Sequence, residues 1–112
     1  MWTPSAFMFR RTATIETPSA TKDSLGGAGR TVWAPLYTDI KVMVQQHAVR
    51  EITLGGGETA ETDTTIFTLF NVSGAARGHR VTVDSMQVFL VLSARREGDN
   101  VNLFRIECKT IQ

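Results

Sequence analysis

The side chains that could do acid–base or nucleophilic chemistry are few in this chain of 112 residues: two histidines, one cysteine and scattered carboxylates. His47 and His79 stand alone, without a second histidine at metal-binding spacing and without a G-x-S-x-G turn. A catalytic nucleophile or base needs an orienting partner close by. We therefore expect both histidines to lie on the surface or at an interface, and we expect no enzymatic activity, no metal and no cofactor.

The single cysteine, Cys108, excludes a disulfide within the chain and argues against a thiolate zinc site. It belongs to a run whose side chains alternate in character, with Phe104, Ile106 and Cys108 on one face and Arg105, Glu107 and Lys109 on the other. A period of two predicts a strand with one buried and one solvated face. Cys108 is therefore expected to be a small core residue.

Two glycine clusters could in principle cradle a phosphate. The first, at 26–29, precedes Arg30 and lacks the G-K-[ST] ending of a P-loop. The second, at 55–57, precedes Glu58, which places a carboxylate where the anion would sit. Both clusters predict flexible loops instead.

The charge is nearly balanced, with 12 Lys+Arg against 11 Asp+Glu and a formal net charge of +1. Proteins that hold nucleic acid through many phosphates usually carry a strong basic excess. A barrel that binds single strands would also expose aromatic side chains among its basic ones. Here the aromatic residues of the apolar runs are expected to pack in the core, and the loop between two strands is acidic: Phe67, Phe70, Phe89 and Phe104 in the runs, Glu58, Glu61 and Asp63 in the loop.

The chain has no run of about 18 apolar residues that could cross a membrane. Its first residues, MWTPSAFMFRR, place apolar side chains before basic ones, the reverse of a secretory signal. We expect a protein made in the cytosol, with residues 1–9 forming an apolar N-terminal arm.

The pattern of the whole chain predicts one all-β domain over 1–112. We expect a small closed or partly open β-barrel of about six antiparallel strands, with long loops at 17–38 and 47–63. The start of the second loop could be a short strand or a turn of helix. The run 64–72 is apolar on both sides, which predicts a strand buried on both faces. The remaining strands are expected at 11–16, 39–46, 79–83, 86–94 and 101–111, with tight turns at 84–85 and 97–100.

The order of these parts resembles the head–tail joining proteins of tailed bacteriophages, specifically the head-closure or stopper family, which phage-derived gene transfer particles also carry. The resemblance covers about residues 10–111. It rests on the Thr-rich first strand, the loop DSLGG at 23–27, VWAP at 32–35, DIKVMVQQ at 39–46, the Arg50–Glu51 pair, TTIFTLFNV at 64–72 and the ending from His79. The acidic loop at 58–65 departs from the common pattern.

This resemblance implies a structural protein of the virion neck, assembled in the host cytoplasm. It implies a homo-oligomeric ring, usually a hexamer, between a portal adaptor above and a tail-completion or tail-tube protein below. Genomic double-stranded DNA would pass through the ring without sequence-specific binding. No membrane partner is implied.

Two sets of residues are expected to act in such a ring. The channel or gating loop is placed at 52–61, with Ile52, Thr53, Leu54, Gly55, Gly56, Gly57, Glu58 and Glu61. The ring or adaptor interface is placed on Trp2, Phe7, Phe9, Asp23, Leu25, Gly26, Gly27, Trp33, Arg50 and Glu51. Two alternatives stay open: a tail-completion or tail-tube joining protein, and a single-stranded nucleic-acid-binding barrel.

Overall fold

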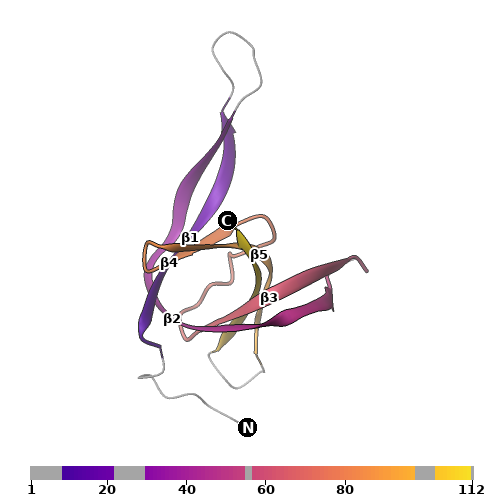
Figure 1. Ribbon diagram of the computed structural model, residues 1–112. Coiled ribbons are helices and arrows are strands. Elements are labelled where there is room, and N and C mark those ends of the chain that lie inside the picture. Colours follow the sequence, from indigo (N-terminus) through magenta and orange to yellow (C-terminus); the bar gives the residue numbers. More distant parts are fainter. Residues whose placement is uncertain (1–8, 22–29, 55–56, 98–102, 112) are drawn as a thin grey trace.

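The structure, a computed structural model, describes residues 9–21, 30–54, 57–97 and 103–111 and contains six antiparallel strands (Figure 1). They are β1 (Arg11–Thr21), β2 (Arg30–Thr53), β3 (Thr59–Thr68), β4 (Arg80–Val83), β5 (Gln87–Arg96) and β6 (Phe104–Ile111). Their order in the sheet is β1-β2-β3-β6-β5-β4, and β4 pairs with β1, so the sheet closes on itself. The expected all-β barrel of six antiparallel strands is confirmed. None of the described residues forms a helix that could cross a membrane.

Strand β2 is 24 residues long, and its successive parts belong to three different parts of the fold. Its first part, 30–35, pairs only with the end of β1 and forms a two-stranded arm that extends beyond the barrel (Figure 1). Its middle part is a barrel stave between β1 and β3, and its last part, 50–53, pairs with the start of β3 as a second hairpin. Register shifts next to Ile15 and between Gln46 and Arg50 separate the parts, and such irregularities bend a strand.

The inside of the barrel holds the main core, and the alternation of the strands explains its composition. Ile40 and Val42 of β2 point inward and Lys41 points outward, as the period of two predicts. The other strands supply the remaining buried side chains, which include Ala13, Ile15, Ile66, Val81, Val83, Phe89, Val91, Phe104, Ile106 and Cys108. Burial of these apolar groups is the main term that stabilises the closed sheet.

A second apolar cluster lies on the outside of the barrel, against β3. Phe67 points away from Ile66 and packs with Phe9 and Leu103, while Met43 and Leu69 complete the cluster. This explains why β3 is apolar on both faces. It also corrects the expectation for Phe9, which is buried within its own chain and is not a free anchor for a neighbour.

The two long loops expected at 17–38 and 47–63 are wrong over most of their length, because the described residues there are strands. Glycine, proline and serine in these stretches suggested loops, but a two-stranded ribbon needs no apolar period. Its backbone groups satisfy one another across the pair, from Glu16↔Pro35 to Thr21↔Arg30 in the arm and from Arg50↔Thr62 to Thr53↔Thr59 in the hairpin. The undecided start of the second stretch is strand.

Strand β3 ends at Thr68, four residues earlier than the run 64–72 predicted. The Thr68 hydroxyl accepts a hydrogen bond from the Phe70 N–H at 3.1 Å, and the Asn71 side chain accepts one from the Ser73 N–H at 3.0 Å. Local bonds of this kind compete with the strand ladder. They turn Phe70 out to solvent, where it meets Tyr37 edge to face, so the expectation of a buried Phe70 is wrong.

The turn between β4 and β5 uses Asp84 and Ser85, which have φ values of 53° and 57°. The Met86 N–H donates to the Val83 carbonyl at 3.0 Å, which gives a two-residue turn with both central residues left-handed. Asp84 is held there because its carboxylate accepts hydrogen bonds from the Thr12 N–H and from Arg11. The exposed Ser85 has no such compensation.

Ser85→Gly should therefore stabilise the protein, by about 0.5–1 kcal/mol, because glycine adopts a positive φ without steric cost. Ser73→Gly is the matched control: Ser73 is also exposed but has no positive φ, so this change should destabilise slightly. Urea unfolding of the two variants measures both effects. Equal shifts in the same direction would contradict the turn assignment.

Candidate functional site: the β2–β3 hairpin and its polar anchor

The β2–β3 hairpin, defined here as residues 50–63, contains the segment predicted to gate a channel. Its side chains alternate between two environments. Leu54 and Thr62 are buried and Ile52 and Ala60 are half-buried, so these residues share an inner face. The outer face carries the exposed residues Glu51, Thr53, Thr59 and Glu61. The segment is thus a structured ribbon with an inner and an outer side.

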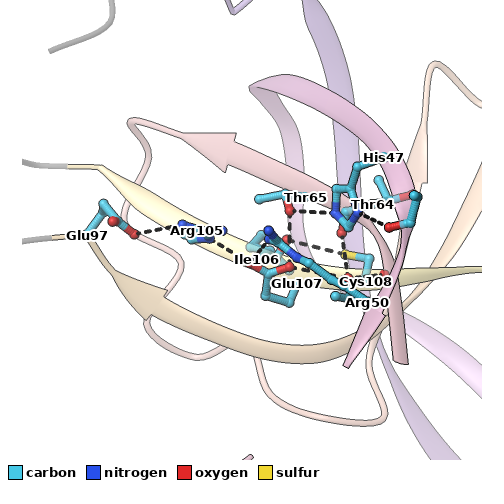
Figure 2. A network of polar contacts seen from close by, with 11 residues as sticks. His47, Arg50, Thr64, Thr65, Glu97, Arg105, Ile106, Glu107 and Cys108 are labelled. Atoms are coloured by element: carbon cyan, nitrogen blue, oxygen red, sulfur yellow. Dashed lines mark hydrogen bonds and ion pairs between the residues drawn. The ribbon is translucent and has the colours of Figure 1, made fainter. Parts of the chain in front are cut away.

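The hairpin is anchored to the barrel through the carboxylate of Glu107 on β6. Glu107 is only 5% exposed, although the sequence placed it on a solvated face. Arg105 Nε donates to Glu107 Oε1 at 2.6 Å, and the Thr65 hydroxyl donates to Oε2 at 3.0 Å (Figure 2). The Thr62 hydroxyl lies 3.2 Å from the same Oε2. Arg50 Nη2, from the base of the hairpin, lies 3.5 Å from Oε1. The carboxylate thereby joins β6, β3 and the hairpin.

Opposing effects act on the pKa of Glu107. Burial alone would raise it, but the hydrogen bonds from Arg105 and Thr65 and the positive charges of Arg105 and Arg50 outweigh burial, so the pKa lies below its ordinary value. The carboxylate is accordingly charged at neutral pH. A buried charge is tolerated only with such partners.

Further polar contacts fix the base of the hairpin on both sides. The single hydroxyl proton of Thr62 is shared between the Glu107 carboxylate and the Cys108 carbonyl, whose oxygen lies 2.8 Å from the Thr62 hydroxyl. His47 Nδ1 lies 2.8 Å from the Ala48 carbonyl, which can only accept, so this nitrogen carries a proton; Nε2 lies 3.1 Å from the Thr65 hydroxyl. The predicted solitary histidine is thus part of the structural network.

Asp63, next to Thr62, ties β3 to the end of β6. One carboxylate oxygen accepts bonds from the Thr110 N–H at 2.9 Å and from the hydroxyls of Thr110 and Thr64. Burial would raise the pKa of Asp63, but these bonds and the charge of His47 lower it overall. The hairpin base is held from both strands that flank β3.

The tip of the hairpin is tethered as well. Glu58 Oε2 forms an ion pair with Arg77 Nη1 at 2.5 Å, across to the segment between β3 and β4. The Leu54 N–H donates to the Glu58 carbonyl at 2.6 Å, and Gly57 has a φ of 85° that favours glycine. Both partners of the ion pair are exposed, so it positions the tip more than it stabilises the fold.

An open pocket of about 470 Å³ lies between the hairpin and the outer face of β5 and β6. Its lining includes Arg50, Glu51, Ser93, Arg95 and Arg105, with Glu107 at its base. The pocket therefore has mixed charge, and its positive groups exceed its negative ones.

The predicted site residues differ in where the structure places them. The structure brings Arg50, Ile52, Leu54 and Glu58 into contact with the chain's own body, while Glu51, Thr53 and Glu61 face outward. Trp33, in the arm, is half-buried beneath Arg80, whose guanidinium lies 4.4 Å from a ring centroid and is paired with Glu16. Gly57 is described above. The other predicted residues lie outside the described part of the chain: Trp2, Phe7, Asp23, Leu25, Gly26, Gly27, Gly55 and Gly56.

The other groups with chemical potential have structural partners. His79 Nδ1 accepts from the Ala76 N–H at 3.1 Å. Cys108 is buried, as expected, and burial together with the charges of Glu107 and Asp63 raises its thiol pKa far above the ordinary value. Within the described residues no group of three potential metal ligands gathers.

Sequence reasoning missed the anchor itself. Glu107 alternates with apolar residues and was therefore expected on a solvated face, whereas Thr62 was expected in a loop and Thr65 in a strand buried on both faces. One feature of the sequence could have indicated this anchor: the run 62–68 contains four threonines, and the last strand carries one glutamate, Glu107, between the basic residues Arg105 and Lys109. Threonine hydroxyls are what a half-buried carboxylate needs as donors.

A closed barrel with two projecting hairpins, one of them anchored by buried ionic contacts, defines a class of small structural domains built to present extended segments. Comparison with known proteins identifies the class further. The family of phage head completion proteins matches residues 4–111, and the chain belongs to this family. It is therefore a structural protein of phage-type virions, with a role in joining head and tail.

One solved structure similar to this chain is a component of the "Virion of native gene transfer agent (GTA) particle". The TM-score is 0.58 at 15% identity, and the alignment covers 91% of this chain and 94% of the other. At this identity the likeness shows a shared fold. None of the curated proteins matches the chain in sequence.

Glu107→Gln should destabilise the protein by about 2–4 kcal/mol at neutral pH, because the half-buried Arg105 loses its counter-charge and the buried hydroxyl donors lose a charged acceptor. The folded state holds the pKa of Glu107 below its ordinary value, so its contribution is present above the unfolded pKa. It is lost as the pH falls through the folded pKa. The variant should therefore lose less stability than the wild type between neutral and acid pH.

Urea unfolding across that pH range measures this difference. Glu51→Gln is the matched control, because Glu51 is exposed and forms no ion pair with the described residues. Equal acid sensitivity of Glu107→Gln and wild type would show that another carboxylate dominates.

Proposed function

We propose that this head completion protein forms a ring with copies of itself at the neck of the particle and closes the DNA channel there. The observation that carries the proposal is the family match over residues 4–111, together with a barrel that projects two hairpins in different directions. A ring must contact neighbours at its sides, above and below, and extended hairpins supply such contacts. The ring would have six copies, as the resemblance to stopper proteins implies.

The β1–β2 arm, defined as residues 16–21 and 30–35, suits contact with an adaptor or a sister subunit. Beyond Glu16 its strands pair only with each other, and two-stranded ribbons are marginally stable alone in water. Val32, 40% exposed, and the exposed Pro18 and Pro35 offer apolar surface on it. Burial by a partner would stabilise the arm.

The end of the β2–β3 hairpin, with Leu54, Gly57 and Glu58 as its described residues, is our candidate for the part that faces the channel. The nearly balanced charge of the chain, a formal net charge of +1, would let DNA slide past without being bound. The tether from Glu58 to Arg77 would hold several tips in one fixed arrangement around the axis. In this proposal the described residues that flank the gate belong to a ribbon held in place against the barrel.

A tail-completion role, one layer lower, is the second candidate. The same two hairpins would serve a ring in that layer. Localisation of the subunit in purified particles by electron microscopy separates the two positions.

Particles assembled without this protein test the function. We expect filled heads that leak DNA and carry no tails, and we expect the wild-type chain supplied in trans to restore both properties. A chain with the arm shortened, lacking 19–32, should fold but fail to restore tails. Normal tailed particles in the absence of the protein would refute the proposal.

Shortening the β2–β3 hairpin tests the gate. Removal of Ile52 and Thr53 together with Thr59 and Ala60 takes two facing pairs out and shortens the ribbon by about 7 Å while it preserves the facing of the remaining residues. We expect DNA leakage from heads that otherwise receive the protein. Thr53→Ala/Thr59→Ala is the control of unchanged length, and leakage from it, or retention by the short variant, would contradict the assignment.

A further inference from the structure

The outer face of the β2–β3 hairpin carries two carboxylates directly opposite each other. Glu51 and Glu61 are cross-strand partners, and both are exposed. Neither forms an ion pair with any described residue. Like charges in this position destabilise a hairpin, so the pair opposes the folded form of the isolated chain.

The two carboxylates stay on the outer side of the hairpin stem, although Glu51 also borders the open pocket that faces β5 and β6. The inner face of the hairpin is occupied by Leu54 and by Thr62, which bonds Glu107, and the tip is held by the Glu58–Arg77 pair. The outer face is thus presented in a fixed orientation. A surface that is ordered before binding loses little entropy when it binds.

A complementary charge lies at the end of β5. Arg95 is the cross-strand partner of Arg105, another like-charge pair. Arg105 is neutralised by Glu107 at 2.6 Å and lies 3.9 Å from Glu97, but Arg95 is exposed and forms no ion pair with the described residues. Arg96 follows it as the last residue of β5 and is also exposed; its side chain leaves the strand on the opposite face, but its charge adds to the positive potential at this strand end.

Within one chain these charges do not meet. Glu51 and Arg95 line the same open pocket of about 470 Å³ but form no ion pair across it. Glu61 lies directly opposite Glu51 in the strand register, on the outer face of the hairpin, and has no positive partner there among the described residues. Opposite charges that stay apart within a chain can be satisfied between two chains.

We propose that Glu51 and Glu61 of one subunit bind Arg95 and Arg96 of the next, which makes the stem of the hairpin the contact between neighbouring copies in the ring. The inference rests on the proposed function and names the partner as a second copy of this chain. The two patches are different parts of the same molecule, so the contact is head to tail, and repetition of such a contact closes into a ring when the rotation permits. Charge complementarity also steers subunits together and is weakened by salt.

Charge reversal with exchange tests this contact. The first variant carries Glu51→Lys and Glu61→Lys, and the second carries Arg95→Glu and Arg96→Glu. Each is supplied to particles that lack the wild-type protein, alone or together with the other. In a ring that alternates the two variants, every contact again joins opposite charges, whereas in a ring of either alone every contact joins like charges.

We expect each variant alone to reduce the number of tailed, DNA-retaining particles by about 100-fold or more, and the mixture to restore them. Thermal unfolding must first show that both variants fold. Activity of either variant alone would overturn the contact while the proposed function stands, because the wild-type chain still restores particles. Failure of the second variant alone, with the first active, would indicate that the arginines contact DNA.

Failure of the mixture, with both variants folded, would also overturn the contact. A failure of the proposed function gives a different result, because particles without any copy of the protein would then be normal. Sedimentation of the purified wild-type protein adds an independent measure. Its self-association should weaken at high salt, and salt-independent association would contradict a contact made by charges.

Discussion

The position of the β2–β3 hairpin depends on one interaction, the burial of the charged Glu107 carboxylate among its hydrogen-bond donors. A charge this far from water is stable only while its donors stay in place, and those donors come from three strands: Arg105 on β6, Thr65 and Thr62 on β3, and Arg50 on β2. The charge therefore fixes the position of the β2–β3 hairpin relative to the barrel. An apolar contact would be less directional and would tolerate sliding of the hairpin over the barrel surface.

The closed barrel, in contrast, is stabilised by the packing of apolar side chains in its interior. Six short staves enclose an apolar interior, and the pairing of β4 with β1 removes the open edges that a flat sheet would expose. Strand β2 then runs through both halves. It forms part of the arm, of the barrel and of the hairpin, so the two projections share one continuous strand with the core.

This arrangement suits the ring that we propose for this head completion protein. The barrel folds with its own core, while the arm and the outer face of the hairpin carry groups that the isolated chain leaves without full compensation: an apolar ribbon in one case and facing carboxylates in the other. A protein whose unsatisfied groups lie on projections can be stable before assembly and can gain further stability from it. Near-neutral net charge is compatible with DNA that passes through without being held.

The sequence by itself determined the barrel. Period-two alternation at 40–44 and 104–108 assigned the inner faces correctly, Asp84–Ser85 marked a tight turn, and Cys108 was recognised as a core residue, because all of these depend on neighbours along the strand. Only the tertiary structure shows that the two hairpins are paired strands and that Glu107 is buried. The pairing of 16–21 with 30–35 and of 50–53 with 59–62 leaves no apolar period in the sequence. A glutamate between basic residues is expected to be solvated unless a distant hairpin covers it. Burial of that carboxylate depends on Thr62, Thr65 and Arg50, which lie some forty to sixty residues earlier in the chain, so no local pattern could reveal it.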